Sequence, residues 1–331
     1  MAKIDFDYSF VIRTVGTAGA KYQALLNAIE HLTIKPREVL IVLPEGYEPP
    51  PERLGWERFI YTPKGMIAQR AFCLDEIKTE YALFSDDDWT FEPSLVEKLI
   101  IPILEGRADV TFPIFPGLLP QGFLRRFVMA SIGSAVPIIF PGRRFTKILS
   151  SGSYAYNPHI KKTSKGEFIA ETAPGLCFLT SVLHMKELHF EEEMWIDKAK
   201  YSWGEDQAMF YKLFLQGKKI VGVAGMDFTH LDAGSSSPER KKNVAYAQGY
   251  FRYVFWHRFI YDLRTTPLQR KLAKIHFQWM LLRGRLYSLI LRLARPNKEI
   301  DRYGAKGRED AIIFVNSERY KSLPKITNKF K

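Results

Sequence analysis

The segment Tyr81-Ala-Leu-Phe-Ser-Asp-Asp-Asp-Trp89 decides the fold class of this 331-residue chain. Its apolar part has the length of a buried β-strand, and it ends abruptly in Asp86, Asp87 and Asp88. In open α/β sheets, ligands bind just beyond the carboxyl ends of the strands. Three adjacent carboxylates repel one another unless a cation neutralises them. The segment therefore predicts either a strand that ends at a Mg²⁺ or Mn²⁺ site shared with substrate phosphates, or a solvated acidic turn that caps the next helix.

Predicted strands and helices alternate on both sides of this segment. Short apolar runs predict strands at 10–14, 38–43, 58–61 and 220–224, and apolar residues at helical spacing predict helices at 21–32 and 67–78. This alternation is typical of an α/β fold with a doubly wound, mostly parallel sheet and right-handed crossovers. We expect three regions: a nucleotide-binding half at 1–105, an acceptor-binding half at 106–237, and a basic helical appendage at 238–331.

The composition is that of a globular protein with a real core. Hydrophobic residues make up 46% of the chain and aromatic residues 14%, which excludes a disordered chain. Cys73 and Cys177 each lie in an apolar stretch without a zinc-type spacing, which indicates buried thiols in a reducing compartment. The first ten residues lack the pattern of a secretory signal, so we expect a cytoplasmic protein.

The excess positive charge is confined to the last third of the chain. Residues 1–237 hold 26 Lys and Arg against 29 Asp and Glu, a net charge of −3, whereas residues 238–331 hold 22 against 7, a net charge of +15. A one-sided basic region predicts a polyanionic partner, either an anionic membrane face or a nucleic acid.

Residues 127–141 carry no charged side chain. These fifteen residues, interrupted by Gly133 and Pro137, fall short of the ~20 that a membrane-spanning helix needs. Two interpretations remain open. The segment is either buried in the second half of the domain or forms a loop that dips into a membrane surface, flanked by arginines on both sides.

Residues 265–295 predict a basic amphipathic helix. Its apolar stripe recurs in steps of three and four residues: Leu268, Leu272, Ile275, Trp279, Leu282, Leu286, Leu289 and Leu293. The stripe could lie in the interface of an anionic bilayer, or pack on the body or on a partner helix. We favour the membrane surface and expect no nucleic-acid partner, because the chain contains no recognisable nucleic-acid-binding module. The protein is then expected to be peripheral on the inner membrane face.

Two further positions carry candidate chemistry. Glu205-Asp206 begins a predicted helix, where the dipole favours negative charge and where a carboxylate can also act as a general base. His230 lies in a Gly- and Ser-rich turn, His230-Leu-Asp-Ala-Gly-Ser235, after a predicted strand. Backbone donors in such a turn can approach a phosphate.

These residues form an ordered set: an acid triplet after the fourth strand, an acidic pair about 120 residues later and a His about 25 residues after that. The set, with the opening strand–helix pattern, resembles the family 2 glycosyltransferases of the GT-A fold over residues 8–260. The resemblance implies metal-dependent, inverting transfer of a sugar from a nucleoside-diphosphate donor to a hydroxyl of a glycan or lipid-linked acceptor.

The resemblance also implies roles for the acidic residues. Asp86-Asp87-Asp88 looks like the DxD motif of the family, in which Asp86 and Asp87 would face the bound nucleotide and Asp88 would bind Mn²⁺ or Mg²⁺. Glu205-Asp206 looks like the ED motif, in which Asp206 would deprotonate the acceptor hydroxyl with Glu205 beside it.

Further positions match the family with two departures. By the resemblance, His230 completes the metal site, Arg70 contacts the diphosphate or base, and Thr14 contacts the nucleoside. Family members usually show an Asp pair after the second strand, where this chain has Glu45. The Pro that usually ends the first strand is replaced by Arg13.

Two other function classes fit the sequence. A nucleotidyltransferase also needs acids at strand ends, but segment 15–21 lacks the spacing of a phosphate-binding P-loop. A non-enzymatic protein could bind a membrane surface through its basic C-terminal region alone.

Overall fold

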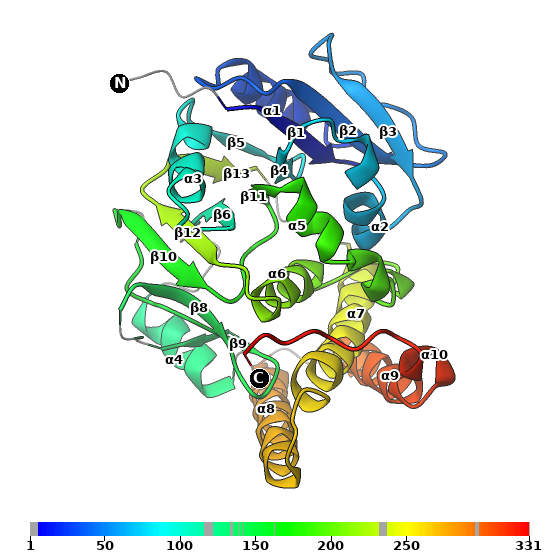
Figure 1. Cartoon of the computed structure of the whole chain (residues 1–331). Helices are drawn as coiled ribbons and strands as arrows, with labels where there is room; N and C mark the ends of the chain where they lie inside the picture. The colour runs from blue at the N-terminus through cyan, green and yellow to red at the C-terminus, as the bar shows by residue number, and fades with distance from the viewer. Residues whose placement is uncertain are drawn as a thin grey trace.

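The computed structural model of the chain describes residues 6–115, 122–132, 135–138, 140, 142–161, 163–231, 237–294 and 298–330. Its centre is a mixed sheet flanked by helices (Figure 1). In spatial order, its strands are β3 (Arg58–Thr62), β2 (Glu38–Pro44), β1 (Tyr8–Arg13), β4 (Tyr81–Ser85), β11 (Cys177–Ser181), β6 (Val110–Pro113), β12 (Ile220–Ala224), β10 (Gly166–Ala170), β8 (Arg144–Ile148), β9 (Tyr154–Tyr156) and β7 (Ala135–Pro137). The predicted α/β class with a mostly parallel sheet is confirmed.

The strands β3, β2, β1 and β4 run parallel to one another, as the sequence predicted. The connections are α1 (Ala20–Glu30) and α2 (Met66–Ala71). The predicted helix at 67–78 is shorter in the structure, because the chain tightens into a 3₁₀ turn at Leu74–Glu76. That turn buries Leu74 against the core.

Strand β11 is inserted antiparallel between β4 and β6. Its first residue, Cys177, therefore pairs with Ser85, the last residue of β4. The loop that precedes β11 consequently meets the acid triplet, and the backbone N–H of Asp86 donates to the carbonyl oxygen of Leu176 at 2.9 Å. The sequence patterns did not predict β11.

A second, two-stranded sheet pairs β5 (Trp89–Phe91) with β13 (Phe228–His230). In this antiparallel ladder His230 lies opposite Trp89, and the N–H of Leu231 donates to the carbonyl oxygen of Asp88 at 2.6 Å. The small sheet therefore joins the acid triplet to a segment about 140 residues further along the chain.

Helices cover both faces of the large sheet. Alternate strand residues such as Phe10 and Ile41 pack against α1 and α3 (Leu95–Leu104). Their neighbours, such as Val11 and Leu40, face the opposite core, which is formed with α2, α5 (Val182–Glu187), α6 (Glu205–Leu215), α7 (Pro238–Trp256) and the 3₁₀ turns Phe190–Glu193 and Ile196–Lys198. Both cysteines are buried and free, as expected.

The C-terminal region begins inside this core. Tyr250, Phe251 and Val254 of α7 are buried with the sheet, and a π-helical turn at His257–Tyr261 follows. Then come α8 (Pro267–Ala294), α9 (Lys298–Val315), which packs along α7, and the short α10 (Glu318–Lys321). Helix α8 projects from the body beside α4 (Phe123–Ile132), which it contacts (Figure 1). Within the described residues, no helix combines the length and the apolarity needed to cross a membrane.

Candidate active site

The ends of β1 and β4 bring a cation and the first acid of the triplet together. Ile12 pairs with Ser85, so the residues that follow them are neighbours. Nε of Arg13 donates to Oδ1 of Asp86 at 2.5 Å, and Nη2 of the same guanidinium donates to Oε1 of Glu205 at 3.0 Å. Burial alone would lower the pKa of Arg13, but these two carboxylates hold that pKa above its ordinary value. Arg13 therefore links the acid triplet to the acidic pair of α6.

The second acid of the triplet is held by the residue that follows β1. The Thr14 hydroxyl donates to Oδ2 of Asp87, and Nε2 of the buried Gln69 donates to the carbonyl oxygens of Thr14 and Val42 at 3.0 and 2.9 Å. Burial raises the pKa of Asp87 to about 6, although the hydrogen bond from Thr14 opposes this shift. Gln69 thus ties Thr14, directly after β1, to the end of β2 and fixes the backbone that carries the Thr14 hydroxyl.

Asp88 and His230 form the pair that could hold a metal ion. Nε2 of His230 lies 3.2 Å from Oδ2 of Asp88, because the β5–β13 ladder places the two residues side by side. Adjacent ligands of an octahedral ion with bonds of about 2.1 Å are separated by about 3.0 Å, so the spacing suits Mg²⁺ or Mn²⁺. Among the residues that the structure describes, no third His, Cys, Asp or Glu joins the pair. The predicted turn at 232–235 lies outside the described residues.

Arg70 projects from α2 toward the same acids. Its Nη2 donates to the carbonyl oxygen of Gly175 at 2.8 Å and lies 3.6 Å from Oδ1 of Asp86. Burial, with the nearby charge of Arg13, lowers the pKa of Arg70 to about 10. Nη1 of Arg13 and Nε of Arg70 are buried without a hydrogen-bond partner, so the site retains two cationic donors for an anionic ligand.

The acidic pair begins α6 as predicted, with Glu205 and Asp206 in its first turn. Gly204 precedes the helix with a φ of 80°, and a Cβ there would overlap the ring of Phe251. Oδ1 of Asp206 accepts from the N–H of Gln207 at 2.7 Å, and Oδ2 accepts from the N–H of Gly175 at 3.4 Å. Burial first, and the adjacent charge of Glu205 second, raise the pKa of Asp206 to about 7.

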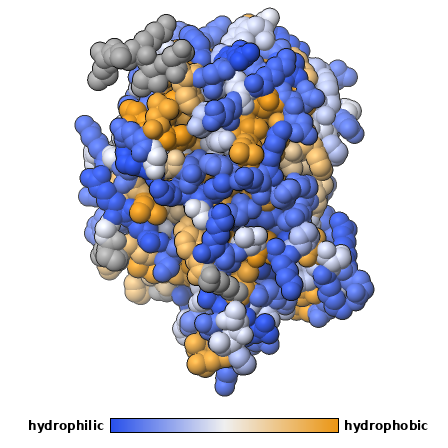
Figure 2. All heavy atoms as spheres, viewed as in Figure 1, coloured by the Kyte–Doolittle hydropathy of each residue, from blue (hydrophilic) through white to orange (hydrophobic). Residues whose placement is uncertain are grey.

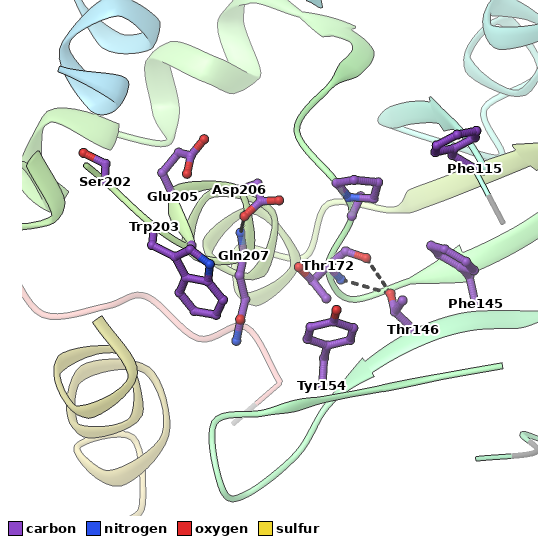
Figure 3. A pocket seen from close by; sticks show the side chains of 13 residues that line it. Phe115, Phe145, Thr146, Tyr154, Thr172, Ser202, Trp203, Glu205, Asp206 and Gln207 are labelled. Atoms are coloured by element: carbon purple, nitrogen blue, oxygen red, sulfur yellow. Dashed lines mark hydrogen bonds between the residues drawn. The ribbon is translucent and has the colours of Figure 1, made fainter. Parts of the chain in front are cut away.

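A cavity of about 320 Å³ opens beside the acidic pair (Figure 3). The sticks show Asp206 and Glu205 on one wall next to Trp203, with Tyr154 and Thr146 opposite. Its aromatic lining consists of Phe115, Phe145, Tyr154 and Trp203. Aromatic walls with a few polar groups are typical of small-molecule sites. The cavity can present a bound hydroxyl to Asp206.

The structure thus brings most of the predicted site residues into one cluster. These are Thr14, Arg70, Asp86, Asp87, Asp88, Glu205, Asp206 and His230. Glu45 stands apart from these contacts, with its side chain exposed at the end of β2. The roles implied for the individual residues stay predictions.

Sequence reasoning missed two parts of the site. Arg13 was noted only as a departure, and a cation directly after an apolar strand was the available signal. Gly175 was not singled out, although the Pro174-Gly175 turn is visible in the sequence. A Cβ on Gly175 would lie 2.9 Å from Nη2 of Arg70 and 3.0 Å from Cβ of Asp206, which explains the glycine.

Comparisons with known proteins support the fold. No protein-family model and no curated protein matches the sequence. Among solved structures, the chain is similar to residues 1–349 of TarS from S. aureus, a glycosyltransferase, with a TM-score of 0.50 and 14% sequence identity. The match covers 96% of this chain and 83% of the TarS chain. The chain therefore has the α/β fold of a known glycosyltransferase, with a large, mostly parallel sheet flanked by helices.

Proposed function

We propose that this protein is a metal-dependent, inverting glycosyltransferase. It moves a sugar from a nucleoside-diphosphate donor to a hydroxyl of a glycan or lipid-linked acceptor. The observation that carries the proposal is the position of Asp206, a partly buried carboxylate whose pKa is raised to about 7 and which lines an aromatic cavity next to the acid triplet. The fold shared with TarS supports the same activity.

Asp206 is suited to accept a proton from the acceptor hydroxyl. A general base works best when its pKa lies near the working pH, because it is then both ionised and basic. The two backbone N–H groups on its oxygens keep the carboxylate oriented, and Trp203 and Tyr154 offer ring faces to an acceptor sugar in the cavity. An acceptor attacking from this side, opposite the departing diphosphate, inverts the anomeric carbon in a single displacement.

The acid triplet and the two arginines form the donor side of the site. Thr14, Asp86 and Asp87 are proposed to contact the nucleoside, Arg70 the diphosphate, and Glu45 the base. Asp88 and His230 would hold Mn²⁺ or Mg²⁺, which when bound offsets the charge of the leaving diphosphate. Two protein ligands suit ions that share their coordination sphere with substrate phosphates.

The first test is thermal stabilisation by UDP, GDP, dTDP and CDP, with and without Mn²⁺. A ligand that binds only the folded state raises stability by RT ln(1 + [L]/Kd). We expect one diphosphate to stabilise the wild type in a Mn²⁺-dependent way and Asp88→Ala to lose that dependence. Asp75→Ala is the matched control, because Asp75 is an exposed surface residue. A metal effect that survives in Asp88→Ala would exclude Asp88 as a ligand.

The second test addresses the reaction. Asp206→Asn should keep Mn²⁺-dependent nucleotide binding but lower sugar transfer by about 100-fold or more, because the hydroxyl loses its proton acceptor. The measurement is release of the nucleoside diphosphate from the corresponding sugar nucleotide. Unchanged turnover would remove Asp206 from the base role, and release of pyrophosphate instead would indicate a nucleotidyltransferase.

A further inference from the structure

Helix α8 has two apolar faces, and only one of them packs on the body. Ala273 and Phe277 are buried, and Met280 is partly buried against the main core. The second face consists of Leu268, Leu272, Ile275, Trp279, Leu282 and Leu286, all of which are exposed. At 100° per residue, this outer stripe is about 80° wide and its centre lies roughly 150° from the packed face. The outer stripe is therefore not part of the core.

The charged side chains that α8 itself carries beside the outer stripe are all basic. Helix α8 carries no Asp or Glu, whereas Arg270, Lys271, Lys274, Arg283 and Arg285 lie along its described part. Figures 1 and 2 show the helix projecting from the body, with hydrophobic side chains at its free end. An exposed apolar stripe of this length, bordered by one sign of charge, marks an interaction surface.

Helix α4 adds apolar side chains next to α8. Phe123 is 86% exposed, and Leu124 and Phe127 are also exposed. The two helices contact each other at the same end of the molecule (Figure 1). This arrangement adds three apolar side chains to the end of the molecule that carries the stripe.

We propose that the outer stripe of α8 and the apolar residues of α4 dock on the surface of an anionic lipid bilayer. The apolar side chains would enter the acyl boundary while the basic side chains meet the headgroups. Charge complementarity selects this partner. A second copy of the chain would bring the two sets of basic side chains together without compensating acids, and a nucleic acid would leave the six large apolar residues in water.

The docking surface lies close to the proposed acceptor cavity. Met280, on the inner face of α8, lines a small cavity together with Tyr154, Trp203 and Gln207, which also line the large one. Only the thickness of α8, about 10 Å, separates that inner face from the outer stripe. The role of this docking surface in the reaction rests on the proposed function, since a bilayer would present a lipid-linked acceptor within reach of Asp206.

Vesicle flotation without any nucleotide sugar tests the docking independently of the reaction. We expect the full-length protein to float with vesicles of phosphatidylglycerol and phosphatidylcholine, and to float less with pure phosphatidylcholine or at high salt. The triple variant Leu272→Gln/Ile275→Gln/Trp279→Gln should bind at least about 100-fold more weakly, because three apolar side chains no longer leave water.

The matched control is Leu183→Gln/Ile313→Gln/Trp56→Gln, which replaces the same residue types at exposed positions elsewhere. It should float like the wild type, and both variants should keep the wild-type melting temperature. Equal flotation of the two variants, or no flotation of the wild type, would overturn the proposal. A concentration-dependent dimer that disappears only in the α8 variant would replace the bilayer with a second copy of the chain.

Discussion

Arg13 gives two adjacent carboxylates different environments. Glu205 is paired with its guanidinium, whereas the oxygens of Asp206 accept from backbone N–H groups. Desolvation, together with the adjacent charge of Glu205, raises the pKa of Asp206 to about 7. Neighbouring acids with different environments are how enzymes divide acid and base tasks between chemically similar groups. Arg13 also holds Asp86, so one buried cation positions groups on both sides of the site.

The pH dependence of activity follows from this arrangement. If Asp206 must be ionised to accept a proton, kcat/KM should rise with pH around a midpoint near its pKa of about 7. Glu205→Gln removes the neighbouring negative charge and leaves Arg13 less neutralised. Both changes lower the pKa of Asp206. The rising part of the curve of kcat/KM against pH should therefore shift to lower pH by about one unit.

Initial rates between pH 5 and pH 9 would measure this shift, with Glu318→Gln, whose side chain is exposed on α10, as the control that leaves the profile in place. A rising limb that stays where it is in Glu205→Gln would mean that another group sets the pH dependence.

At the scale of elements, the close crossing of α7 and α9 depends on glycines. A Cβ at Gly249 would overlap the carbonyl oxygen of Gly304, and one at Gly307 would overlap that of Tyr246. The sequence did not predict this contact, because glycine at a helix–helix interface gives no apolar periodicity. Backbone atoms cannot move aside like a side chain, so larger residues there push the helices apart.

Gly249→Ala should therefore lower the free energy of unfolding by about 1–3 kcal/mol, although alanine is the better helix former. Gly284→Ala in α8 is the matched control, since its added methyl group meets nothing within 4 Å. It should raise stability by about 0.5–1 kcal/mol. Urea unfolding of both variants measures the difference. A stabilised Gly249→Ala would show that α7 and α9 are not packed this closely.

At the scale of the whole molecule, the basic C-terminal third is not a simple tail. Phe277, Ala311, Phe314 and Tyr320 belong to the same buried cluster as the sheet. Arg258, which follows α7, donates from Nε and Nη2 to the two carboxylate oxygens of the fully buried Glu193, at 2.8 and 2.9 Å. The predicted domain boundary at residue 237 stays untested. These contacts show that the residues which make them are packed on the main core and do not form a separate unit.

Deletion of residues 265–331 should consequently destabilise the body of the protein itself. It exposes the face of α7 that α9 covers and removes the buried side chains of Phe277, Phe314, Val315 and Ile326, each worth about 1.5–3 kcal/mol. The expected result is a melting temperature lowered by more than 10 °C or an aggregated product, seen by thermal scanning and gel filtration. A truncated protein that melts like the full chain would show that this region is an independent appendage.

The sequence by itself determined the four parallel strands β1 to β4, the helix α1, the start of α2 and the place where the acid triplet leaves the sheet. Those features follow from local periodicity and from the rule that strand ends carry the site. Only the tertiary structure decided that Arg13 joins Asp86 to Glu205, because the partners lie 73 and 192 residues away. It also decided that the outer stripe of α8 faces outward, since periodicity defines an apolar face but not what covers it.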